Sequence, residues 1–197
     1  MNTEDTTVFI AGYSPESQSR ICFAWNGKHA ADFVDVNDTF RQQVIASVLA
    51  EPGKASLDLV GDLFQAEGQR SKEAWCIRDS FSKLGTILLK CGGASQLDRF
   101  LDSFALSFDS YSECHAMTLD QVTLAPLISE VEARLAGAKD KCQKARLVMA
   151  RDLFAKHESG NPLKGMFKVN PSQLGPARAV SKVKIWFHKV LRLFRRG

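Results

Sequence analysis

The chain has 197 residues, of which 45% are apolar and 24% are charged, and its 26 Lys and Arg exceed its 22 Asp and Glu by four. A disordered protein would carry fewer large apolar residues and a less balanced charge, so that class is excluded. The 13 Gly and 6 Pro also exclude a collagen-like or low-complexity chain. The length suffices for one domain with a sizeable core, with or without a tail.

The five cysteines indicate a reducing compartment. An odd number does not fit a disulfide framework, and a chain of this length can build a core without disulfides. The first residues show no basic region followed by an apolar run, and no stretch approaches about 18 consecutive apolar residues. We therefore expect free thiols and a cytoplasmic protein, either free or bound peripherally to a membrane.

Charge divides the chain in two. Residues 1–158 contain 17 Lys and Arg against 22 Asp and Glu, a net charge of −5, whereas residues 159–197 contain 9 Lys and Arg and no acid, a net charge of +9. A basic tail on an acidic body points to an anionic partner, whether lipid head groups, nucleic acid or an acidic protein. The alternative is that the tail folds back on the body.

The N-terminal region favours β-strands. Residues 7–13 and 20–25 are rich in β-branched and aromatic side chains, and a third such segment covers residues 28–36. Asn26-Gly27, between the second and third segments, is the strongest signal for a two-residue hairpin turn. The sequence therefore predicts a small antiparallel β-meander over about residues 6–36.

From about residue 39 to residue 157 the apolar spacing becomes that of helices. Asn37, Asp38 and Thr39 are N-cap types before the first helix, and Pro52-Gly53 ends it. Further helices are predicted over about residues 57–68, 71–90, 97–111 and 118–157. The last three have apolar residues spaced alternately by three and four, which favours a near-antiparallel bundle over a long intermolecular coiled coil.

The predicted fold class is thus α+β and helix-dominated, with the β-meander, a helical bundle and a C-terminal amphipathic helix. Residues 1–158 are expected to form a globular body. Residues 159–180, which contain three Pro and three Gly, are expected to form a linker, and residues 181–197 a basic amphipathic helix.

The C-terminal segment carries the strongest interaction signal. On a helical wheel at about 100° per residue, its apolar residues other than Ile185 fall on one arc of about 160°, and its basic residues fill the opposite arc. This pattern is typical of a helix that lies in a membrane interface. The predicted binding residues are Lys182, Lys184, Trp186, Phe187, Lys189, Val190, Arg192, Leu193, Phe194, Arg195 and Arg196.

Three other readings of that helix stay open. Its basic face could bind nucleic acid while its apolar face packs on the body. Its apolar face could instead enter a groove of a partner protein, or dock on its own bundle. A surface helix that docks on its own bundle usually carries both acidic and basic residues on its solvent-exposed face. Residues 181–197 contain no acid, which disfavours that interpretation.

Motifs for catalysis are missing from the sequence. It contains no phosphate-binding loop, no Gly-x-Ser-x-Gly, no His-Glu-x-x-His and no Gly-x-Gly-x-x-Gly. Cys76, Cys91, Cys114 and His115 are a weak zinc candidate, because structural zinc ligands come in pairs two to four residues apart. Cys114 and His115, as sequence neighbours, point apart and do not suit a nucleophile and its base. We predict no cofactor, no metal and no enzymatic activity.

Three acids and two tryptophans complete the candidate residues. Asp32, Asp35 and Asp38 are closely spaced, and we interpret them as a solvated strand edge followed by an N-cap rather than a cation site. Trp25 and Trp75 are interpreted as core or hairpin-packing residues. The predicted function is a non-enzymatic regulatory or adaptor protein attached to an anionic membrane. The alternatives are a nucleic-acid-binding protein and an enzyme without a recognisable motif.

Overall fold

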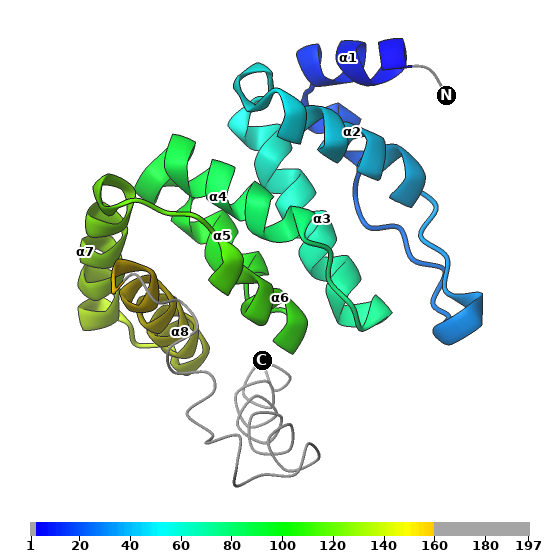
Figure 1. Cartoon of the computed structure of the whole chain (residues 1–197). Coiled ribbons are helices and arrows are strands. Elements are labelled where there is room, and N and C mark those ends of the chain that lie inside the picture. Colours follow the sequence, from blue (N-terminus) through cyan, green and yellow to red (C-terminus); the bar gives the residue numbers. More distant parts are fainter. Residues whose placement is uncertain (1–2, 160–197) are drawn as a thin grey trace, which may run out of the picture. The chain divides into compact units, whose positions relative to one another are not determined.

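The computed structural model describes residues 3–159, which belong to two compact units (Figure 1). The first unit ends at Leu119 and contains helices α1 to α6, and the second begins at Asp120 and contains α7 and α8. The helices are α1 (Thr3–Ala11), α2 (Asp38–Ala50), α3 (Leu57–Ala74), α4 (Ser80–Gly92), α5 (Leu97–Ser103), α6 (Phe108–Glu113), α7 (Gln121–Gly137) and α8 (Lys141–Glu158).

The helix-dominated part of the predicted fold is confirmed, and the predicted β-meander is wrong. The described residues contain no β-strand, and their only β-type pairing is one antiparallel bridge between Trp25 and Asp35. The segment predicted as the first strand forms α1, and the turn after it is a short 3-10 helix, Pro15–Arg20. The fold of the described chain is therefore all-α.

Tertiary contacts explain why residues 7–13 do not form a strand. Phe9 of α1 and Tyr13, two residues after the helix, have ring centroids 5.6 Å apart, and the Phe9 ring lies 5.0 Å from that of Phe40 of α2. The Tyr13 hydroxyl donates a hydrogen bond to Asp62 of α3, 2.5 Å away. Packing on two helices thus outweighs β propensity, whose scale spans only about 1 kcal/mol per residue and depends strongly on context.

The Asn26-Gly27 pair turns the chain but does not close a two-residue hairpin. Gly27 has a φ of +80°, which suits glycine, yet the backbone partner of Asn26 is the carbonyl of Val34, so the turn spans seven intervening residues. The Asn26 side chain fills this wider loop by donating to the carbonyl of Asp32 and accepting from the backbone of Val34. Residues 22–36 therefore form a long loop, and we call them the 22–36 loop.

The helix bounds differ from prediction mainly through extra breaks. The first predicted helix is confirmed as α2, but the segments predicted over 71–90, 97–111 and 118–157 are each interrupted. Trp75 ends α3 in a left-handed conformation, Ser107 starts α6 with a capping box, and Asp140 caps α8 by accepting from the backbone of Gln143. Local caps thus divide segments whose apolar spacing runs on without a break.

A chain of aromatic rings forms the centre of the first unit. Phe64 of α3 stacks on Phe81 of α4 at 4.2 Å and on Phe100 of α5 at 5.6 Å, and Phe100 continues to Phe104 at 4.9 Å. All four rings are fully buried. Gly85 makes room for this stack, because a Cβ there would lie 3.2 Å from the Phe64 ring.

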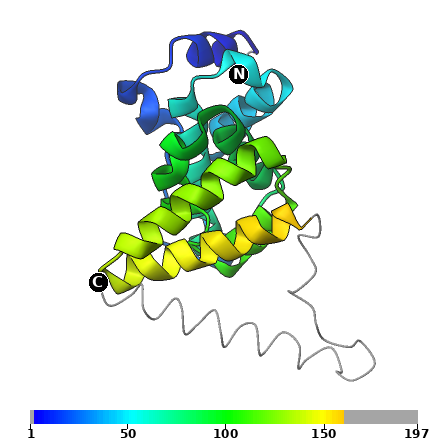
Figure 2. The ribbon, with the colours of Figure 1, turned by 90° about the vertical axis from the view of Figure 1, so that its left-hand side faces the viewer.

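The second unit is a helical hairpin. Figure 2 shows α7 and α8 running antiparallel beside one another, joined by a short connection. The buried residues of these helices are mainly apolar: Leu124, Leu127 and Val131 in α7, and Leu147, Met149, Ala150, Leu153 and Phe154 in α8. Pro126 lies inside α7 rather than at its start.

Among the helices that the structure describes, none is at once long and apolar enough to cross a membrane.

Candidate functional site

The predicted binding residues of the C-terminal segment lie outside the described part of the chain, which ends at Ser159. The same holds for the predicted linker beyond that residue. The structure therefore supplies a site only from the two described units.

The weak zinc candidates do not gather into a site. Cys76 and Cys91 are exposed, whereas Cys114 and His115 are buried in a 3-10 turn after α6. No group of three or more metal-binding side chains converges within residues 3–159. Burial raises the pKa of the Cys114 thiol well above its usual range, with a smaller contribution from Glu113. None of the five cysteines forms a disulfide.

The closely spaced acids have a different role from the one expected. Asp35 is buried rather than solvated, and it binds the Nη2 atom of Arg41 at 2.5 Å. Asp38 is the first residue of α2 rather than its N-cap, and it also contacts Arg41, at 3.0 Å. Only Asp32 is exposed as predicted. Asp35 and Asp38 thus turn inward towards a buried cation.

Arg41 is the centre of a buried ion network. Its side chain is fully buried in α2, and its Nε donates to Glu67 of α3 at 2.9 Å. Glu67 is also almost completely buried, and it contacts Arg78 at 3.3 Å. Arg78 reaches back to Asp38 with two hydrogen bonds of 2.8 Å, and Arg70 lies 3.6 Å from the same carboxylate.

We call this group the Arg41 network; it comprises Asp35, Asp38, Arg41, Glu67, Arg70 and Arg78. Three cations face three carboxylates, so the network is electrically balanced. Burial disfavours ionisation of Asp38, but the hydrogen bonds and charge of Arg78, helped by Arg41 and Arg70, hold the pKa of Asp38 below its usual value. Burial likewise opposes the charge of Arg41, but Asp35 and Glu67 outweigh it and raise the pKa of Arg41.

The Arg41 network fastens both ends of the 22–36 loop to the helical core. The Nη1 atom of Arg41 donates to the carbonyls of Ile21 and Cys22, at 3.4 and 3.3 Å, where the loop begins. Near the end of the loop, Asp35 accepts a hydrogen bond from the backbone of Ala24, which ties the two sides together. A buried cation with several partners is a specific anchor, because every alternative position would leave it unpaired.

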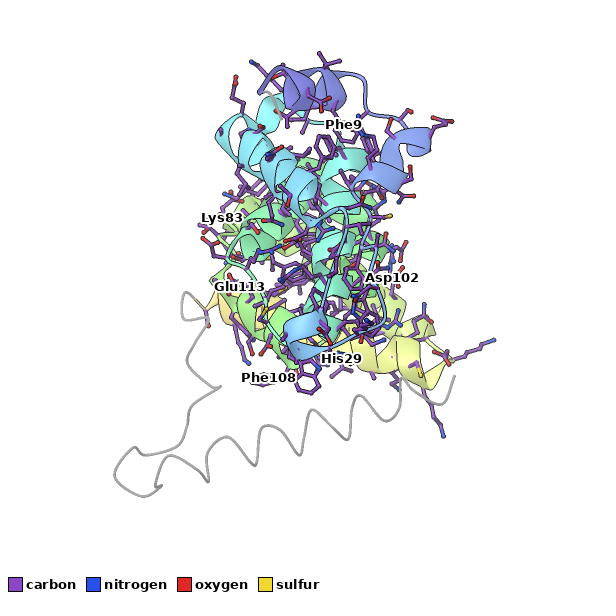
Figure 3. The ribbon with its side chains drawn as sticks, turned by 90° about the vertical axis from the view of Figure 1, so that its right-hand side faces the viewer. Phe9, His29, Lys83, Asp102, Phe108 and Glu113 are labelled. Carbon is purple, nitrogen blue, oxygen red and sulfur yellow. The ribbon has the colours of Figure 1, made fainter. Side chains whose placement is uncertain are left out.

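Between these anchors the loop carries a cluster of rings. Phe23 stacks on Trp25 and Phe33, with centroids 6.4 and 6.3 Å apart, and Trp25 contacts His29 at 4.8 Å. His29 in turn lies 5.9 Å from Trp75, the residue that ends α3. Figure 3 shows His29 at the opposite end of the first unit from Phe9. We call Phe23, Trp25, His29, Phe33 and Trp75 the aromatic surface.

Trp75 departs most clearly from the expected packing role. Its side chain is 80% exposed, and its φ of +55° is a left-handed conformation that costs an L-residue about 1–2 kcal/mol. The other non-glycine residue with positive φ is Ala30, at +57°, directly after His29. Within residues 3–159, both non-glycine residues with this costly backbone therefore lie at the aromatic surface.

The aromatic surface could have been suspected from the sequence in part. Trp25, Phe23 and Phe33 cluster within eleven residues around a turn signal, but Trp75 is about fifty residues further on and reaches them only through α3. The arrangement offers exposed ring faces on a fixed frame, with no nucleophile paired to a base. It is therefore suited to binding rather than to bond-making chemistry.

Comparison with protein-family models, curated proteins and solved structures found no match to this chain. The function must therefore be argued from the residues themselves.

Proposed function

We propose that the protein is a non-enzymatic regulatory or adaptor protein, attached to an anionic membrane surface through residues 181–196. The observation that carries the proposal is the separation of apolar and basic residues in that segment, which contains six Lys and Arg within 16 positions and no acid. A helix with such faces buries its apolar side in the interface while its basic side chains meet the head groups.

The energies favour lipid over nucleic acid. Burial of each large apolar ring contributes at most about 1.5–3 kcal/mol, and Trp186, Phe187 and Phe194 all lie on the apolar arc. Each basic residue near an anionic surface adds about 1 kcal/mol, weakened by salt. Nucleic-acid binding would use the charges alone and leave the rings to be covered elsewhere.

The charge of the rest of the chain is consistent with an adaptor. Residues 1–158 carry a net charge of −5, which an anionic surface repels. Attachment through the tail therefore leaves the acidic body available to other partners. The aromatic surface belongs to this acidic part of the chain.

The test is cosedimentation of the full chain with vesicles of anionic and of zwitterionic lipid. Trp186→Ser combined with Phe194→Ser should abolish binding, because it removes two rings and retains every charge. Lys189→Glu combined with Arg192→Glu should weaken binding to anionic vesicles and reduce its salt dependence. Ile185→Ser is the matched control, because Ile185 lies outside the apolar arc and its loss should leave binding unchanged.

Two outcomes would overturn the proposal. One is persistent vesicle binding by the double aromatic variant. The other is a wild-type chain that ignores vesicles but shifts nucleic acid with a steep salt dependence, in which case the segment binds phosphates through its charges.

A further inference from the structure

We propose that the aromatic surface of the first unit binds a basic peptide segment of a partner protein, whose Arg or Lys side chains lie against the exposed ring faces. This inference concerns residues 22–76 and does not depend on attachment to a membrane.

The first argument is that Trp75 combines two costs that the fold does not require. Glycine is the ordinary residue where a helix ends in a left-handed conformation, because it has no Cβ to strain. At this position the chain has its largest side chain instead, and leaves it 80% exposed. Its one ring contact in the described chain is His29, on the 22–36 loop. A partner protein that covers the Trp75 ring would explain why the fold keeps both its exposed side chain and its strained backbone.

The second argument is that the surface is preformed. The Trp25 indole donates to the carbonyl of Lys28 at 2.7 Å, and the His29 ring lies 3.2 Å from the carbonyl of Glu73 at the end of α3. The loop is thus fixed to α3 at its tip, in addition to the Arg41 network at its ends. A partner would find the rings already in place and would spend little free energy on ordering them.

The third argument is that apolar exposure concentrates at this place. Five large hydrophobic residues are exposed in the described chain, and Val34, Val36 and Trp75 belong to the loop or to the end of α3. An exposed apolar patch of this kind marks an interaction site where its residues lie together, as His29 and Trp75 do at the tip of the loop.

Charge selects the kind of partner. Residues 1–119 contain 10 Lys and Arg against 16 Asp and Glu, a net charge of −6. Around the rings, the Glu73 carboxylate lies 3.7 Å from the ammonium of Lys72, and exposed Asp32 and Lys28 balance each other in sign. Local charges therefore cancel, and the field of the unit and the negative faces of the rings both favour a cation.

Arg70 shows this preference within the molecule. Its guanidinium lies 5.9 Å from the centroid of the Phe33 ring, within the range of cation–π contacts. The outward rings, Trp75 above all, could receive an arginine of a partner in the same way. Tryptophan is the best ring for such contacts.

The experiment measures binding of a fluorescent eight-residue peptide of alternating Arg and Gly to the full chain. The same peptide with Ser in place of Arg is the control ligand, because an acidic peptide would bind the basic residues 159–197 of the full chain. We expect the Arg peptide to bind, the Ser peptide not to bind, and binding to weaken with salt. Failure of the Arg peptide to bind, or equal binding of both peptides, would overturn the proposal.

The decisive variant is Trp75→Gly, because it removes the ring and relieves the backbone at once. We expect peptide affinity to fall about five- to tenfold while the melting temperature stays equal or rises. Val8→Ser, which changes an exposed residue of α1, should alter neither quantity. Unchanged peptide affinity in Trp75→Gly would overturn the proposal, and so would a wild-type dimer that this variant dissociates, since the occupant would then be a second copy.

Discussion

Arg41 and Trp75 both differ from what is usual for their side-chain types, since arginine is usually exposed and tryptophan usually mostly buried. Arg41 is charged and completely buried, whereas Trp75 is aromatic and 80% exposed. The two are connected through the 22–36 loop, whose ends Arg41 anchors and whose tip carries His29 against Trp75. The comparison indicates that the buried Arg41 fixes the position of the 22–36 loop, and that the loop in turn holds His29 against the exposed Trp75.

The largest effect should come from Arg41→Met. This change leaves the carboxylates of Asp35 and Glu67 buried without their central cation, and removing one partner of a buried ion pair costs about 3–5 kcal/mol. Urea unfolding followed by circular dichroism would measure the loss. Lys83→Met, which removes the exposed ion pair between Lys83 of α4 and Asp79 at its N-terminus, should cost less than about 1 kcal/mol. Equal losses in the two variants would show that the Arg41 network does not anchor the loop.

A smaller effect should appear at acid pH. The pKa of Asp38 is lower in the folded chain than in the unfolded chain, so its ionised form stabilises the fold above the unfolded pKa of about 4. That contribution is lost as pH falls through the folded pKa. Stability measured from pH 5 downwards should therefore decline less steeply in Asp38→Asn than in the wild type.

The control for this pH profile is Asp32→Asn. Asp32 is exposed and makes no ion pair with any described residue, so its loss should leave the wild-type slope in place. A slope in Asp38→Asn equal to that of the wild type would contradict the role given to Arg78 and Arg41 in holding the Asp38 carboxylate ionised.

The smallest effects should come from a matched pair of backbone changes in the loop. Gly27 has a φ of +80° and open space around its Cα, so Gly27→Ala should cost about 1 kcal/mol through the backbone alone. Ala30 has a φ of +57°, so Ala30→Gly should be neutral or stabilise by up to about 1 kcal/mol. Shifts of the same sign in thermal melts of the two variants would disprove left-handed strain at Ala30.

Local sequence signals predicted several helix positions correctly. Asn37 is the N-cap residue of α2, and Pro52-Gly53 follows the end of that helix at Ala50, as predicted. These features depend on neighbours within one or two turns, which the sequence displays directly. The breaks at Trp75 and Ser107 were missed, because apolar spacing continues through them.

The candidate site could not be predicted in the same way. Trp75 meets His29 across 46 positions, and Arg78 meets Asp38 across 40. The sequence favoured a solvated strand edge for Asp32 and Asp35, because it does not show that Arg41 packs against Asp35. The aromatic surface and its anchor exist only after α2 and α3 have packed.

The sequence by itself determined the helical nature of residues 38–158, the acidic sign of that body and the basic, amphipathic pattern of residues 181–196. Tertiary structure decided the rest of the described chain. It made residues 7–11 helical despite their β-branched side chains, because Phe9 packs against Phe40 of α2 and Tyr13, just beyond the helix, bonds to Asp62 of α3. It also made residues 22–36 an anchored loop rather than a β-hairpin, because the ion pairs of the buried Arg41 outweigh the local preference for a two-residue turn.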